Sequence, residues 1–204
     1  MPEANTNARL EAFCDGVFAI AMTLLIIDIT PPPTNDIAST SDLWLALMDL
    51  GPSVVAFVLS FAVILITWVN HHAALKLVSR SSASFIYANG FMLLTVVFIP
   101  FPTSLLGEFI PTDFAAPAVV LYDAVLAVQA IGWVLVSDAA LKNGLLADEQ
   151  SAVMMRESRR NGYIAFALYG LLAVAAFWFP LTVVTITIVS WAFWLLLGIR
   201  LKRV

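Results

Sequence analysis

Five ionisable side chains in apolar stretches of the sequence are the residues whose types could do chemistry. Glu11 and Asp15 lie near the N-terminus, His71 and His72 follow a long uncharged run, and Asp123 stands alone further along the chain. Carboxylates and imidazoles inside an apolar protein can transfer protons, bind metals or hold helices together. Their spacing decides which of these roles the sequence supports.

The spacing argues against a metal centre and against an enzyme. Neighbouring positions on a helix point about 100° apart, so His71 and His72 cannot hold one ion together, and no cysteine cluster completes a site. For the same reason, Cys14 beside Asp15 is not a nucleophile with its base. No nucleotide-binding motif occurs either. We therefore expect no metal, no cofactor, no catalytic residue and no nucleic-acid partner.

The composition indicates a membrane protein. Of the 204 residues, 61% are hydrophobic and 12% are charged, whereas a soluble domain carries about 25% charged residues. The mean hydropathy is +0.94. A chain this apolar cannot cover its surface with polar groups, and lipid is the solvent that removes the contradiction.

Six apolar segments predict an all-α, polytopic protein with six transmembrane helices in one domain, residues 1–204. About 20 residues of helix cross a hydrocarbon core of roughly 30 Å. Proline residues end the first segment at Pro31 and kink or end the third at Pro100 and Pro102. The six segments cover approximately residues 10–29, 43–69, 83–106, 114–140, 162–179 and 180–199.

The basic residues orient this scheme. All ten fall on one side of a six-helix arrangement, which is the positive-inside pattern of a cytoplasmic face. We therefore expect a multi-pass protein of the plasma membrane, surrounded by lipid, with both termini in the cytoplasm. The ten residues are Arg9, Lys76, Arg80, Lys142, Arg156, Arg159, Arg160, Arg200, Lys202 and Arg203.

A helical wheel divides the first segment into two opposed stripes. The carboxylate stripe consists of Glu11, Asp15, Phe18, Met22, Leu25 and Ile29. The small-residue stripe consists of Ala12, Gly16, Ala19, Ile20, Thr23 and Ile27. Small residues favour close helix packing in lipid, but copies of this stripe around an axis would also form hydrophobic and hydroxyl rings that suit a cation pore. The residues alone leave both interpretations open.

The carboxylate stripe needs polar partners. A polar cluster ends the second segment on the same predicted side of the membrane as Asp15, and Arg9 lies nearby. An indole, an amide, an imidazole or a guanidinium group would pair the carboxylate. We favour a clasp between the first two helices over a proton relay. The cluster comprises Trp68, Asn70, His71 and His72.

The stretch from Arg9 to Leu25, RLEAFCDGVFAIAMTLL, resembles the signature of the endolysosomal potassium channel family (transmembrane protein 175) and its prokaryotic homologues. That signature is an arginine, then Phe-Ser-Asp, then Gly-Val-Phe-Ala-Ile-Ala and a Thr-Leu-Leu run. The cluster from Trp68 to His72 resembles the family pattern too. The one departure is Cys14, which stands where the family has serine. Its thiol is a weaker hydrogen-bonding group, so we expect it to preserve packing and lose polarity.

The resemblance implies a homotetramer in which the first helix of each chain lines a central potassium pore at the oligomer axis. Ile20 would form the narrow hydrophobic constriction, Thr23 the layer implicated in cation selection, and Ile27 a further apolar ring. As in the family, no Thr-Val-Gly-Tyr-Gly loop is present. The implied support network of the pore helix comprises Arg9, Phe13, Asp15, Trp68, Asn70, His71 and His72.

Two other functions compete with a passive, potassium-favouring cation channel. A secondary transporter or proton-coupled carrier would use Asp15, His71 and Asp123, although no convincing inverted repeat is visible. A membrane enzyme would need a nucleophile, a base and oxyanion donors in one place, which the spacing denies. We therefore predict a channel with K⁺ as its permeant ion and no enzymatic activity.

Overall fold

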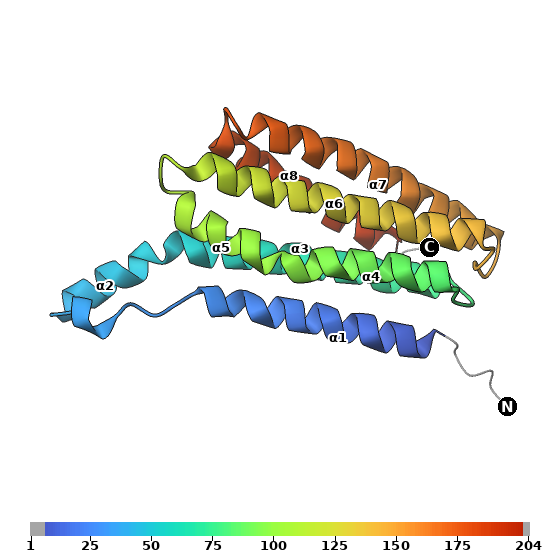
Figure 1. Cartoon of the computed structure of the whole chain (residues 1–204), viewed down its shortest axis with the longest axis horizontal. Coiled ribbons are helices and arrows are strands. Elements are labelled where there is room, and N and C mark those ends of the chain that lie inside the picture. The colour runs from blue at the N-terminus through green and yellow to red at the C-terminus, as the bar shows by residue number, and fades with distance from the viewer. Residues whose placement is uncertain (1–6, 202–204) are drawn as a thin grey trace.

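The computed structural model describes residues 7–201 and shows an all-helical protein whose long helices run side by side (Figure 1). No strand occurs in this range, and one isolated antiparallel bridge joins Val78 to Leu146. The elements in chain order are α1 (Ala8–Leu24), the 3₁₀ helices η1 (Leu25–Asp28) and η2 (Thr34–Asp36), α2 (Thr40–Asp49), α3 (Gly51–Lys76), α4 (Ala83–Phe98), α5 (Pro100–Phe109), α6 (Ala115–Lys142), α7 (Glu149–Ala175) and α8 (Pro180–Leu201).

Four helical segments of the described residues are long and apolar enough to cross a membrane, where the sequence predicted six. They are Ala8–Asp28, Gly51–Lys76, Ala83–Phe109 and Ala115–Lys142. α7 begins with a polar half that contains Arg159 and Arg160, so its apolar part is short. In α8, Pro180–Trp191 forms a shorter apolar helix. The chain is therefore a helical membrane protein, and the fifth and sixth spans stay a prediction.

Proline and helix tightening explain where the first and third segments change. α4 ends just before Pro100, which begins α5 and has no N–H to continue the previous turn. The predicted break in the third segment is thus confirmed. The first segment leaves the α-helix after Leu24 and continues as the tighter η1, so side chains beyond Leu24 turn further per residue than the wheel assumed.

α7 begins earlier than the sequence suggested. The predicted fifth segment starts near Gly162, where the apolar run begins. Instead the helix begins at Glu149, because the Asp148 side chain caps it and accepts a hydrogen bond from the backbone N–H of Ser151 at 2.7 Å. That N–H also holds the pKa of the Asp148 carboxyl below its usual range. The polar residues form the first turns of one continuous helix.

α1 lies at the edge of the helical bundle (Figure 1). α6 packs extensively on α7 and also on α4 and α5, whereas α1 packs on α3 and α4 (Figure 1). The start of α1, the α3–α4 turn and the α6–α7 turn lie at the same end of the bundle. This end carries the predicted cytoplasmic residues Arg9, Lys76 and Lys142. Lys202 and Arg203 lie outside the described residues.

Gly107 marks a close approach of α5 to the α3 backbone. A Cβ atom added at Gly107 would lie 2.8 Å from Ser53 Cα. We expect Gly107→Ala to lower the free energy of unfolding by about 1–3 kcal/mol, because the two backbones must separate. Gly90→Ala in α4 is the matched control, since nothing lies within 4 Å of its added Cβ, and it should be neutral or stabilising. Denaturant titration in mixed micelles measures both, and equal effects would contradict the close contact.

Candidate functional site

The first helix is packed along one stripe and uncovered along the other. All six residues of the carboxylate stripe are buried or half-buried, and all six residues of the small-residue stripe are exposed. Phe18 and Leu25 are 0% exposed, whereas Ile20 is 57% and Ile27 is 66% exposed. Within one chain, α1 therefore uses its carboxylate stripe for packing and leaves the small-residue stripe without a neighbour.

A polar clasp fixes the carboxylate stripe to α3. The Trp68 indole donates a hydrogen bond from Nε1 to Asp15 Oδ1 at 2.7 Å. One turn earlier, Glu11 Oε1 lies 3.2 Å from His72 Nδ1. The Trp68 and His72 rings stack with their centroids 5.9 Å apart. These contacts fix the position of α1 along its axis and its rotation about that axis relative to α3. The rotation in turn sets the direction in which the small-residue stripe faces.

The clasp also brings three metal-binding residue types together. Ligand atoms of Glu11, Asp15 and His72 lie within 4.8 Å of one another. Each group already faces a protein partner, because Asp15 accepts from Trp68 and Glu11 faces His72. The geometry is that of a clasp whose polar groups face one another within the protein. The expectation that no metal binds stays a prediction.

His71 turns away from the clasp into the core. Its Nε2 lies 2.7 Å from Asn89 Oδ1, and the Asn89 amide donates from Nδ2 to the Phe85 carbonyl at 2.7 Å. Because the Asn89 oxygen is the acceptor, Nε2 of His71 carries the proton. The ring also contacts Phe18 of α1, with centroids 5.4 Å apart. His71 therefore links α1, α3 and α4 in the core.

The structure does not bring the whole predicted support network together within one chain. Asp15, Trp68, His71 and His72 meet as described above. Arg9 and Phe13 are exposed, and Asn70 lines a cavity between α3 and the helices on the far side from α1. Cys14 is fully buried in the core, which agrees with the packing role expected of it.

Two asparagines that anchor α1 and α3 were missed by sequence reasoning. Asn7 is buried at the start of α1 and donates from Nδ2 to the Val78 carbonyl in the α3–α4 turn at 2.7 Å. Asn89, which is 0% exposed, accepts a hydrogen bond from His71. A signal did exist for Asn89, because it is a lone amide in a long uncharged segment, and such groups in lipid need a partner.

Asp123 has a structural partner on a neighbouring helix. It is 1% exposed, between α6 and α8, and Thr187 Oγ1 donates to its Oδ1 at 2.9 Å. The preceding residue, Tyr122, hydrogen-bonds Ser60 of α3 at 3.0 Å, and Thr103 of α5 donates to the same Ser60 hydroxyl at 2.7 Å. Asp123 thus lies within a set of buried polar contacts that join four helices and lie apart from the clasp.

The Trp68 hydrogen bond predicts a measurable loss of stability. We expect Trp68→Phe to lower the free energy of unfolding by about 2 kcal/mol, because a half-buried carboxylate loses its charge-assisted donor. Trp178→Phe is the control, since Trp178 is 69% exposed. Denaturant titration in mixed micelles measures both variants. Equal stability of the two would show that the Asp15–Trp68 contact contributes nothing to holding α1.

Comparison with known proteins identifies the family of this clasped helix. The family model of the endosomal/lysosomal potassium channel TMEM175 matches residues 9–100, which include nearly all of α1 and the whole of α2, α3 and α4. A potassium channel of Chamaesiphon minutus is 44% identical over 149 residues, covering 72% of this chain and 73% of the relative. The chain belongs to the TMEM175 family. The predicted resemblance is therefore confirmed.

A second relative and a solved structure extend this finding. A potassium channel of Streptomyces collinus is 42% identical over 135 residues, covering 63% of this chain and 64% of the relative. The crystal structure of a Chamaesiphon minutus homologue of the lysosomal potassium-selective channel TMEM175 matches with a TM-score of 0.75 and 34% identity, covering 92% of this chain and 96% of that one. The TMEM175 family is a family of membrane ion channels, so the expectation that the chain is not an enzyme is confirmed.

Proposed function

We propose that the chain is a potassium-favouring cation channel that conducts passively through a central pore lined by α1 of four identical chains. The observation that carries this proposal is the uncovered small-residue stripe on a helix whose opposite stripe is firmly clasped. A helix that only packed against lipid would need neither the clasp nor small side chains. The potassium channel relatives favour this function over a proton-coupled carrier.

Ile20 and Ile27 form the apolar rings of the proposed pore, and Thr23 forms the layer between them. Ile20 and Ile27 expose more than half of their side-chain surface in the single chain. Four isoleucines around an axis make a narrow hydrophobic constriction that dewets readily. The exposed surface is thus available for a ring that only the assembly completes.

The hydrogen bond of the Thr23 hydroxyl leaves its oxygen available to a cation. Its Oγ1 donates to the Ile20 carbonyl at 2.8 Å. A hydroxyl that donates a hydrogen bond to a backbone carbonyl keeps the lone pairs of its oxygen available to another ligand. Four such oxygens could replace part of the hydration shell of K⁺. The energy needed to remove this water is lower for K⁺ than for Na⁺, so the same four oxygens favour K⁺.

The proposed assembly also gives a place to the network residues that the single chain leaves exposed. Arg9 and Phe13 lie on α1 next to the small-residue stripe and are exposed. Around a four-fold axis, side chains beside an inward-facing stripe lie nearest the adjacent chains. We extend the proposal to the topology: residues 1–204 form one six-span domain in the plasma membrane, with both termini and the basic end of the bundle in the cytoplasm.

A threonine pair tests the selectivity layer. Thr23→Val in liposome flux assays should lower the preference for K⁺ over Na⁺, because valine keeps the shape of threonine and removes its oxygen. Thr185→Val is a matched control, since the Thr185 hydroxyl on α8 is exposed and also donates to its own helix, to the Leu181 carbonyl at 2.9 Å. An unchanged ion preference in Thr23→Val would reject the layer, and wild-type liposomes without K⁺ flux would reject the channel.

A further inference from the structure

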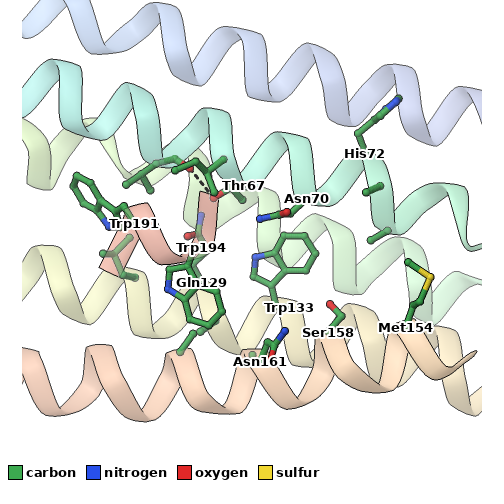
Figure 2. Close-up of a pocket in the computed structure, with 18 of the residues that line it drawn as sticks. Thr67, Asn70, His72, Gln129, Trp133, Met154, Ser158, Asn161, Trp191 and Trp194 are labelled. Atoms are coloured by element: carbon green, nitrogen blue, oxygen red, sulfur yellow. Dashed lines mark hydrogen bonds between the residues drawn. The ribbon is translucent and has the colours of Figure 1, made fainter. Parts of the chain in front are cut away.

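A cavity of about 440 Å³ lies within the bundle, away from α1, between α3, α6, α7 and α8 (Figure 2). This volume falls in the range of small-molecule binding sites, about 300–1,000 Å³. It extends from Trp191 at one end to Met154 near the end of the bundle that carries the basic residues (Figure 2). The proposed pore does not use this space.

Four large aromatic side chains form part of the cavity wall. Trp133 of α6, Tyr169 of α7 and both Trp191 and Trp194 of α8 line the cavity, together with aliphatic and polar side chains of α3, α6 and α7. Flat aromatic faces favour a compact, apolar ligand that can stack against them. Figure 2 shows Trp133, Trp194 and Gln129 near one another in the middle of the cavity.

The cavity lining includes a buried donor without an acceptor. Gln129 is 6% exposed, and its Nε2 has no hydrogen-bond partner among the described residues. The indole nitrogens of Trp191 and Trp194 are also buried and approach the Tyr169 hydroxyl without reaching hydrogen-bond geometry. A buried donor without an acceptor destabilises the protein, because it has lost its hydrogen bond to water. An occupant that offers oxygen would remove this cost.

The charge around the cavity points in the same direction. Lys76 lies at its rim, and no acidic side chain lines it within the part of the chain that the structure describes. An organic cation would therefore meet a like charge at the rim and no carboxylate to pair with in this part of the chain. We propose that the cavity binds a compact, largely apolar molecule that presents a hydrogen-bond acceptor oxygen, with Gln129 as its donor and the tryptophans as its walls.

A ligand in this position would lie close to the residues that hold the pore helix. Trp133 lines the cavity and contacts His71 edge-on, with ring centroids 6.3 Å apart. His71 in turn contacts Phe18 of α1. Two ring contacts thus separate the cavity from the first helix.

Benzophenone is a suitable probe, because it carries one ketone oxygen between two aromatic rings and forms a covalent adduct with nearby C–H groups on irradiation. Labelling of the full-length protein in nanodiscs should be saturable and should map by mass spectrometry to residues 63–77 and 154–169. Labelling that rises linearly with concentration and spreads over the lipid-facing surface would overturn the proposal, and so would the absence of adducts on both segments.

Two variants, each with a matched control, separate binding from partition into lipid. Ala165→Phe fills the cavity and should lower the saturable labelling at least about tenfold, whereas Ala167→Phe on the exposed face of α7 should not. Gln129→Leu keeps the volume and should weaken benzophenone binding about threefold to tenfold through the lost hydrogen bond. Gln150→Leu, at an exposed position, should not. Saturable labelling that neither Ala165→Phe nor Gln129→Leu reduces would overturn the assignment of the cavity.

Discussion

Replacing Ile20 with asparagine is expected to raise potassium flux through the reconstituted protein about tenfold. The physical reason lies in the water that a ring of exposed isoleucines excludes. An apolar constriction makes an ion shed water without offering oxygen in return, and a decrease of only about 1.4 kcal/mol in that barrier raises the rate tenfold. Four asparagine amides would keep the constriction wet and offer carbonyl oxygen to the passing cation.

The control for this prediction is Ile164→Asn. Ile164 lies on α7 and is 53% exposed, close to the 57% of Ile20, but α7 lies on the opposite side of the bundle from α1 (Figure 1). Both variants add the same amide to an exposed isoleucine position of a membrane helix. A liposome flux assay driven by a K⁺ concentration gradient, with equal protein per liposome, compares them. Equal flux from Ile20→Asn, Ile164→Asn and the wild type would remove Ile20 from the pore.

Phe18→Ala is expected to be the most destabilising single change in α1, with a loss of about 2–4 kcal/mol in the free energy of unfolding. Phe18 is 0% exposed and its ring lies against His71. In lipid the phenyl group gains little from leaving water, so the cost arises from the lost dispersion contacts and the cavity left behind. Loss of this contact frees α1 from the core at the level where His71 joins α3 and α4.

Phe166→Ala provides the comparison for Phe18→Ala. Phe166 lies on α7 and is 44% exposed, so its removal leaves no closed cavity. Denaturant titration in mixed micelles should show a change of less than about 0.5 kcal/mol for this variant. A loss for Phe18→Ala no larger than that of Phe166→Ala would mean that α1 is not anchored through Phe18. Flux should fall along with stability in Phe18→Ala, because the pore helix loses its orientation.

The division of α1 into two stripes was predictable because it depends only on local periodicity. Phe18 and Leu25 recur at helical spacing and are buried, while Ile20 and Thr23 face outward. The Asp15–Trp68 pairing was predictable in kind, since a carboxylate at membrane depth needs a donor and the sequence offered a small set of them. Which member of the set is the donor, Trp68 rather than Asn70, depends on the rotation of α3 and required the structure.

Contacts between residues far apart in the chain could not be predicted from the sequence. Asn7 and Val78 are 71 positions apart, and no local pattern links them. The start of α7 was predicted too late because only the apolar run marked the segment, whereas the Asp148 cap and the intrinsic helix preference of the polar residues extend the helix toward the N-terminus. Asn70 was grouped with its neighbours by sequence position, but successive residues on a helix point about 100° apart, and it faces the cavity instead.

The most direct test of the account is whether a cysteine at position 20 lies in the conducting path. In a Cys14→Ser background, the protein has no other thiol, so Ile20→Cys carries a single reactive site. The account predicts that Ag⁺, a small cation that binds thiolate, blocks potassium flux through Ile20→Cys liposomes and leaves Ile164→Cys liposomes conducting. Flux through Ile20→Cys that Ag⁺ does not change, with mass spectrometry showing the thiol occupied, would contradict a pore lined by the first helix.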